Sequence, residues 1–164
     1  MRGFVKLLAL VLLPLVGLTA FDRKSDAAPA GAYNTSPESN AKFLADYAAK
    51  KGVTKLPDGL MYRVIKAGTG PAVLRDTDWV TVYYKGMLIS GKVFDQTHDE
   101  PVQFQAGALI PGWVEALKKM KTGDSWEIVL PSDLGYGADG SGNAIPPNQT
   151  LIFTMTLVKV EYAN

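Results

Sequence analysis

The stretch "SWEIVLPSDLGYGADGSGNAIPPNQTLIFTMTLVKV", residues 125–160, decides the fold, because two alternating segments enclose a glycine-rich one. Every second residue is apolar in both outer segments: Trp126, Ile128 and Leu130 in the first, and Leu151, Phe153, Met155 and Leu157 in the second. Side chains two residues apart point to the same face of a β-strand. The stretch therefore predicts two strands, each with one buried face, joined by a long loop.

The loop between these strands carries an apolar tip. The segment "AIPP", residues 144–147, interrupts a run of glycines and polar residues, and Tyr136 precedes that run. Consecutive prolines stiffen the chain, because each ring fixes its own φ. Surface loops that hold apolar side chains on a rigid scaffold often form binding sites. The loop is therefore a candidate binding element.

Two more strands and one helix are predicted upstream of this stretch. Residues 60–67 and 79–88 have β-like patterns, and Ser90-Gly91 is typical of a hairpin turn. Residues 110–121 place their apolar side chains at helical spacing, and a glycine follows. The expected fold class is α+β, with a curved, mostly antiparallel sheet wrapped around one short α-helix.

A short N-terminal helix is predicted before the sheet. Ser36 is suited to the N-cap and Pro37 to the first helical position, and "KKG" at residues 50–52 suits a helix end. The apolar stripe of this helix is narrow. We therefore expect the helix to lie against the domain or against a partner.

The first residues resemble a secretory signal peptide in their pattern. Arg2 and Lys6 precede an apolar run that is uncharged from Leu7 to Phe21, and "APA" at residues 28–30 offers a small-x-small cleavage site. An uncleaved membrane anchor is the alternative, because the apolar run is near the short end of membrane-spanning length. We expect an exported protein without stable membrane association after cleavage.

The remaining chain divides into two parts, a linker with the short helix at residues 31–55 and a globular domain at residues 56–164. Removing residues 1–30 takes away four of the 17 basic and two of the 16 acidic side chains, which leaves a net charge of −1. Such a balance argues against a nucleic-acid partner, which requires a basic surface.

Conventional catalytic and metal-binding groups are scarce in this composition. The 164 residues include no cysteine and one histidine, His98. Disulfides, thiolate metal sites and multi-histidine metal sites are therefore excluded, and neither a metal nor a cofactor is expected. The site must be sought among other residue types.

Apolar and aromatic residues from separate segments form the candidate site: Tyr84, Phe94, Phe104, Leu109, Ile110, Trp113, Tyr136, Ile145 and Phe153. A hydrophobic core is the simpler explanation for any one of them taken alone. However, Tyr136 and Ile145 lie in a glycine-rich loop, and Phe94 precedes the acidic Asp95. These positions are unusual for a core and favour a binding pocket.

Five ordered motifs carry a resemblance to a known family: "VTVYYKGML" (80–88), "GKVFDQT" (91–97), "LIPGWVEAL" (109–117), "GDSWEIVLPSDLGYG" (123–137) and "IPPNQTLIFTMTLVKV" (145–160). In order and spacing the chain resembles the FKBP-type peptidyl-prolyl cis-trans isomerases, and residues 40–70 resemble the connector of secreted bacterial members of the Mip/FkpA type. The resemblance implies a peptidyl-prolyl isomerase of the periplasm that acts on proline-containing polypeptides.

The resemblance also implies the roles of the site residues. Trp113 would form the floor of a proline pocket, with walls from Tyr84, Phe94, Phe104, Leu109, Ile110 and Phe153. Asp95, Tyr136 and Ile145 would be the catalytic residues. Val102 and Ala144 are smaller than the matching family residues, which thins one wall. Macrolide inhibitors are further candidate ligands, and a monomer is expected because only a linker and one short helix precede the domain.

Two other functions remain open from the sequence. The main alternative is a secreted holdase chaperone that binds unfolded segments through the same apolar cleft, with weak or incidental isomerase activity. A carbohydrate-binding β-domain would use the tryptophan and tyrosine rings as platforms, but paired acids or amides beside exposed rings are not evident.

Overall fold

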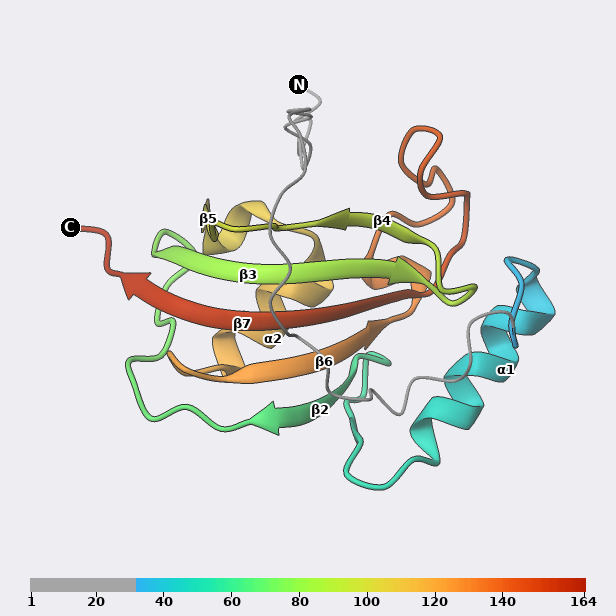
Figure 1. The fold of residues 1–164 in the computed structure, drawn as a ribbon, viewed down its shortest axis with the longest axis horizontal. Coiled ribbons are helices and arrows are strands. Elements are labelled where there is room, and N and C mark those ends of the chain that lie inside the picture. The colour runs from blue at the N-terminus through green and yellow to red at the C-terminus, as the bar shows by residue number, and fades with distance from the viewer. Residues whose placement is uncertain (1–31) are drawn as a thin grey trace.

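The computed structural model describes residues 32–164, so the predicted signal peptide lies outside the described residues. Seven strands form one antiparallel sheet: β1 (Thr54–Lys55), β2 (Met61–Lys66), β3 (Trp79–Leu88), β4 (Val93–Gln96), β5 (Val102–Gln105), β6 (Ser125–Leu130) and β7 (Leu151–Glu161). The spatial order is β1-β2-β6-β7-β3-β4, and β5 also pairs with β3. Figure 1 shows the order from β2 through β6, β7 and β3 to β4. The predicted α+β class is confirmed.

Strands β3 and β7 form the centre of the sheet, and their alternating patterns explain why. Val80, Val82 and Tyr84 of β3 are buried, whereas Trp79 is 44% exposed. The pairing runs from Trp79 opposite Glu161 to the far end of both strands, with one irregularity after Thr81. The two long strands bury the same face, and together these faces form one side of the hydrophobic core.

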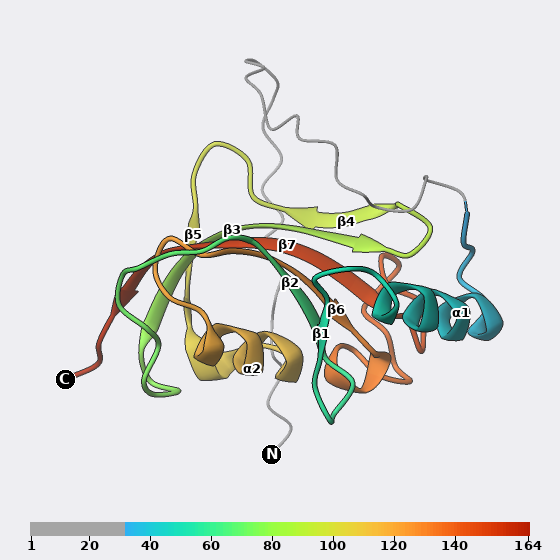
Figure 2. The same ribbon diagram turned by 90° about the horizontal axis from the view of Figure 1, so that it is seen from below.

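Helix α2 (Pro111–Lys119) lies in the concave side of the curved sheet, as Figure 2 shows. Its buried residues include Trp113 and Leu117, which pack into the main core. The helix is shorter than the predicted residues 110–121. Ile110 and Met120 have extended backbone conformations and act as the two caps, so neither continues the helix.

Helix α1 (Pro37–Ala48) begins as predicted, with the Ser36 side chain accepting a hydrogen bond from the Ser39 N–H at 3.2 Å. It ends before the predicted "KKG". The Ala49 N–H still donates to the Ala45 carbonyl four residues back, but the Lys50 N–H donates to the Tyr47 carbonyl three residues back, which tightens the last turn. Of the two expected placements, against the domain or against a partner, the structure shows packing against the domain.

Helix α1 covers one end of the outer face of the sheet and creates a second buried cluster: Phe43, Tyr47, Met61, Ile89, Val129 and Ile152. The main cluster, with α2, lies on the opposite side of the same strands. Strand β6 is buried along its whole length, although its sequence predicted only one buried face. Helix α1 packs over Val129 and Glu127 of this strand, a cover that strand periodicity cannot reveal.

The connections complete the frame of the site. The predicted Ser90-Gly91 hairpin turn between β3 and β4 is present, with Gly91 at φ 86°. Two short 3₁₀ helices, η1 (Ala106–Ala108) and η2 (Ser132–Leu134), precede α2 and the glycine-rich loop. Among residues 32–164, no helix has the length and apolar character needed to cross a membrane.

Candidate functional site

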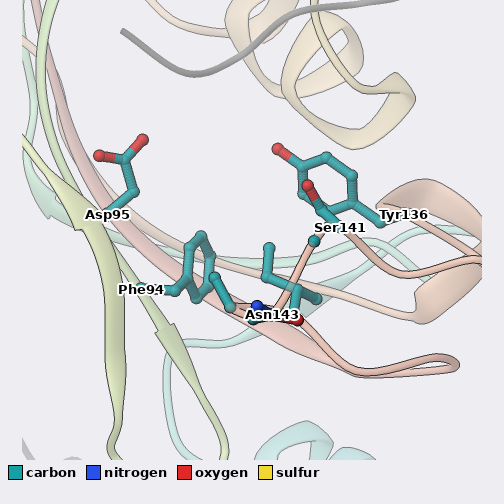
Figure 3. Close-up of a pocket in the computed structure, with 8 residues that line it drawn as sticks. Phe94, Asp95, Tyr136, Ser141 and Asn143 are labelled. Atoms are coloured by element: carbon teal, nitrogen blue, oxygen red, sulfur yellow. The ribbon is translucent and has the colours of Figure 1, made fainter. Parts of the chain in front are cut away.

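A hollow of about 140 Å³ opens between strand β4 and the loop that precedes β7. It is lined by Phe94, Asp95, Tyr136, Ser141, Gly142, Asn143, Ala144 and Ile145 (Figure 3). A cavity of about 150 Å³ holds a benzene ring, so this hollow accommodates a ring the size of a prolyl side chain. Four residues of the predicted site, Phe94, Asp95, Tyr136 and Ile145, therefore meet at one place.

The pocket loop (residues 137–148) owes its shape to backbone hydrogen bonds and to glycine. Its base is closed by the Asn148 N–H, which donates to the Gly137 carbonyl at 2.8 Å. Near its tip, the Ser141 N–H donates to the Ile145 carbonyl at 2.8 Å. Gly140 has φ 63°, and a Cβ there would lie 2.3 Å from the Ile145 oxygen. The loop thus turns tightly enough to hold the buried Ile145 side chain in the hollow.

An aromatic cluster, which we call the aromatic floor, adjoins this hollow through Phe94 and is centred on Trp113, which is only 1% exposed. Its ring meets those of Tyr84 and Phe153 edge to face, with centroids 5.1 and 5.2 Å apart. Phe104 meets it at 6.2 Å and Phe94 meets Phe153 at 5.5 Å, both again edge to face. Edge-to-face contacts are the favoured geometry of aromatic pairs. These rings form one continuous apolar cluster.

Gly86 makes the approach of two of these rings possible, and the sequence reasoning missed it. A Cβ at this position would lie 2.7 Å from Phe153 Cε1 and 2.7 Å from the Phe94 ring. The signal was available, because a glycine inside a strand often marks a close approach of another group.

Hydrogen bonding and burial set the polar edge of the site. The Tyr84 hydroxyl donates to Asp95 Oδ2 at 2.5 Å, and burial and this bond raise the pKa of Tyr84. Burial, and then the charge of Asp95, raise the pKa of Tyr136 to about 12. The Tyr136 hydroxyl and the Asp95 carboxylate face each other across the hollow (Figure 3). Both hydroxyls therefore remain protonated donors at neutral pH.

Six predicted site residues do not line the hollow: Tyr84, Phe104, Leu109, Ile110, Trp113 and Phe153. Leu109 and Ile110 belong to the same buried cluster as Trp113 but do not line the hollow. The indole N–H of Trp113 is buried and has no hydrogen-bond partner among the described residues. Conversely, Ser141 and Asn143 line the hollow without having been predicted, because nothing in a polar loop sequence distinguishes an inward side chain.

The Ile145 N–H is already engaged in this structure. It donates to the Ser141 carbonyl at 3.1 Å. A substrate carbonyl that accepted from this N–H would have to share or replace that bond. Within residues 32–164, no group of histidine, aspartate and glutamate side chains is arranged to hold a metal ion.

Comparison with known protein families shows where this chain belongs. The family model of the FKBP-type peptidyl-prolyl cis-trans isomerases matches residues 70–158. The chain belongs to this family. A second model, the domain amino terminal to FKBP-type peptidyl-prolyl isomerases, matches residues 17–64. The resemblance seen in the sequence motifs is thereby confirmed.

Curated proteins similar to this chain include bacterial FKBP-type peptidyl-prolyl cis-trans isomerases. The chain is 43% identical over 152 residues to the outer membrane protein MIP of Legionella longbeachae, covering 89% of this chain and 65% of that protein. It is 39% identical to the FKBP-type 22 kDa isomerase of Escherichia coli, covering 87% of this chain and 70% of that protein. With FkpA of Escherichia coli the identity is 41%, over 89% of this chain and 56% of that protein. The chain thus spans about half to two thirds of the length of most of these relatives.

Solved structures of the family share the fold. A peptidyl-prolyl cis-trans isomerase from Pseudomonas syringae matches with a TM-score of 0.72 and 39% identity, over 76% of this chain and 92% of that chain. The crystal structure of FkpA from Escherichia coli matches with a TM-score of 0.72 and 42% identity, over 76% of this chain and 59% of that chain. The FKBP-like architecture expected from the sequence is confirmed.

Proposed function

We propose that this chain is a peptidyl-prolyl cis-trans isomerase that accelerates rotation about X–Pro bonds in proteins that are being exported or folded. Its substrates are proline-containing polypeptides. The observation that carries the proposal is the apolar hollow on an aromatic floor, with the donor Tyr136 at its edge, in a chain of this family. The names of the relatives support the same activity.

The reaction needs no group that this chain lacks. An X–Pro bond prefers trans by only about 0.5–1 kcal/mol, yet the barrier to rotation is about 18–20 kcal/mol because rotation breaks amide resonance. No covalent bond is made or broken, so neither a nucleophile nor a proton shuttle is required. The enzyme has only to bind the twisted amide better than either planar isomer.

A dry pocket favours the twisted amide over the planar one. The planar amide gains stability in water from charge separation between its oxygen and nitrogen, and the twisted amide has lost that resonance. Transfer from water to the apolar hollow therefore penalises the planar ground state more than the transition state. Burial of the prolyl ring over the floor supplies the binding energy that holds the bond there.

The site residues take these roles in the proposal. Trp113 lies under the prolyl ring, and the walls are formed by Tyr84, Phe94, Phe104, Leu109, Ile110 and Phe153. The Tyr136 hydroxyl and the Ile145 N–H donate to substrate carbonyls. Asp95 acts through its hydrogen bond with Tyr84, which fixes both side chains at the pocket edge, and not as a general base.

The hydrogen bond from the Ile145 N–H to Ser141 determines when this N–H can donate to a substrate carbonyl. Because this N–H donates to Ser141 in the structure, the donor becomes available only as the loop adjusts to the substrate. The gain for the transition state is then smaller than that from a free donor, since one hydrogen bond is exchanged for another.

A protease-coupled assay with a proline-containing peptide tests the proposal directly. We expect residues 31–164 to accelerate the slow cis-to-trans phase at substoichiometric amounts. The matched variant carries Trp113→Ala and Phe94→Ala, which together remove the floor and one wall. Wild-type activity in that folded double variant would refute the assignment of the site.

A refolding experiment distinguishes the holdase function from the isomerase function. An isomerase speeds the slow phase of a proline-limited client at substoichiometric amounts, whereas a holdase needs one molecule of protein for each client chain. The paired Tyr84 and Asp95 with Tyr136 favour the isomerase, because binding unfolded segments requires apolar surface but not this ordered polar edge.

Location, assembly and inhibitors complete the proposal. We place the protein in the periplasm, after cleavage of residues 1–30 as a signal peptide, with residues 31–55 as the linker and helix and residues 56–164 as the isomerase domain. Mass spectrometry of the mature N-terminus tests the cleavage. The mature protein is a monomer and binds macrolides weakly, because the small Val102 and Ala144 thin one pocket wall; sedimentation and titration calorimetry test these two points.

A further inference from the structure

Helix α1 reaches the chain segment that ends the pocket loop, 110 positions further along the sequence, through a buried side-chain amide. Asn40 is 6% exposed and accepts a hydrogen bond from the Thr150 N–H through Oδ1 at 2.8 Å. Thr150 is the residue just before β7 and is itself buried. The helix is thus tied to the start of the strand that the loop leads into.

A second buried amide completes this contact. Gln149 is 5% exposed, and its Nε2 donates to the carbonyls of Thr35 at 3.1 Å and Pro147 at 3.0 Å. Asn40 Nδ2 donates to the Ser36 carbonyl at 2.9 Å and lies 3.4 Å from Gln149 Oε1. We call the pair Asn40 and Gln149 the amide clamp. Buried amides are retained where every polar atom finds a partner, and here they do.

The amide clamp holds the return of the pocket loop, which carries Ile145. Asn148, between the clamp and the prolines, has φ 58° and is the single non-glycine residue with positive φ among the described residues. A strained residue persists only when its surroundings fix it. The fixed points on either side are the Asn148 bond to Gly137 and the Thr150 bond to Asn40.

We propose that Asn40 is a positioning residue for the isomerase site: through Thr150 it sets the return of the pocket loop and so the location of Ile145. The claim rests on the proposed function. Asn40 does not line the hollow and touches no substrate. It acts on the reaction through the loop, so the first turn of α1 is part of the machinery that shapes the pocket.

The other end of α1 provides a matched control. The Tyr47 hydroxyl donates to Glu127 Oε1 at 2.8 Å, in the buried cluster on the outer face of the sheet. Tyr47→Phe removes one buried hydrogen bond between α1 and the sheet but leaves the amide clamp in place. Glu127 keeps its ion pair with Arg63. If α1 served only to stabilise the domain, Asn40→Ala and Tyr47→Phe would affect activity alike.

The experiment compares three variants, after urea unfolding shows that each is folded. In Asn40→Ala we expect kcat to fall on the order of tenfold with KM within about twofold, because misplacement of the loop affects the transition state while the aromatic floor is untouched. In Tyr47→Phe both constants stay within about twofold of wild type. Asn40→Asp keeps an acceptor for the Thr150 N–H but loses the Nδ2 donor to the Ser36 carbonyl, so its kcat lies between those of Asn40→Ala and wild type.

A spectroscopic readout tests the same claim without any activity. In ¹H–¹⁵N spectra, Asn40→Ala moves the amide signals of residues 137–145 and of Asn148, whereas Tyr47→Phe leaves them in place. A folded Asn40→Ala with unmoved loop signals and with kcat equal to that of Tyr47→Phe would overturn the inference. If Asn40→Ala does not fold, Gln149→Leu is measured instead, with the same expected shifts. An inactive wild type refutes the proposed function, but the loop signals still decide the role of Asn40.

Discussion

Gly86→Ala is the sharpest perturbation that the structure offers, because one methyl group would meet two pocket rings at once. The added Cβ would lie 2.7 Å from Phe153 Cε1 and 2.7 Å from two atoms of the Phe94 ring. Carbon atoms prefer a separation of about 3.5–4.0 Å. The rings must therefore retreat by about 1 Å.

The two rings differ in how far they can yield. Phe153 is fully buried and lies edge to face on Trp113 at 5.2 Å, so its movement disturbs the floor. Phe94 is half-buried and lines the hollow, so it moves more easily and enters the space that a prolyl ring needs. Overpacking of this kind costs about 1–3 kcal/mol of stability. We expect about 2 kcal/mol, with kcat/KM reduced by about tenfold or more because the hollow is narrowed.

Gly52→Ala is the matched control for the loss of stability. Gly52 has φ 80° and a Cβ there would meet no atom within 4 Å, so the substitution strains the backbone without a clash. That strain costs about 1–2 kcal/mol. Urea unfolding gives the stability of both variants and the protease-coupled assay gives kcat/KM. Full activity in Gly86→Ala, with a stability loss no larger than in Gly52→Ala, would refute the steric reasoning.

Three further outcomes are expected. Tyr136→Phe lowers kcat/KM by about two- to tenfold, because one neutral hydrogen bond contributes about 0.5–1.5 kcal/mol; unchanged activity in the coupled assay would remove the hydroxyl from the mechanism. Trp113→Ala raises KM more than Tyr136→Phe does and costs about 3–5 kcal/mol of stability, since it empties the floor; peptide titration and urea unfolding measure both. The folded state loses stability as the pH rises from 10 to 12, because the pKa of Tyr136 is raised from 10.0 to about 12 and the unfolded chain ionises first. The free energy of unfolding, measured with urea at each pH, therefore falls more steeply with pH in wild type than in Tyr136→Phe. Equal slopes would contradict the assignment.

Sequence patterns predicted the secondary-structure elements well where those elements depend only on neighbouring residues. Strand β3 was predicted with its observed bounds, and the inward residues of β7 were correctly identified from their period. The ends of α1 and α2 were less well predicted, because they depend on how the chain turns after the helix. The Ala49 and Lys50 amides, for example, bond back to the last turn before the sequence signal for the end is reached.

The candidate site was predicted mainly through the family resemblance. Phe94, Asp95, Tyr136 and Ile145 line the hollow together, as the resemblance implied. The sequence reasoning missed Asn40, because nothing in a helix sequence indicates that one polar side chain is turned inward to Thr150, 110 positions away and just before β7. It missed Gly86 although a glycine within a strand is a visible signal.

By itself, the sequence determined the alternation of the strands, the N-cap of α1, the glycine-rich loop and the absence of cysteine chemistry, since each depends on neighbouring residues or on composition alone. Only the tertiary structure decided which aromatic rings meet over Trp113, that the Ile145 N–H is engaged by Ser141, and that α1 covers β6 and clamps the pocket loop. The reason is physical. Strand periodicity is a property of successive residues, whereas a pocket is formed by side chains whose separation in space bears no relation to their separation along the chain.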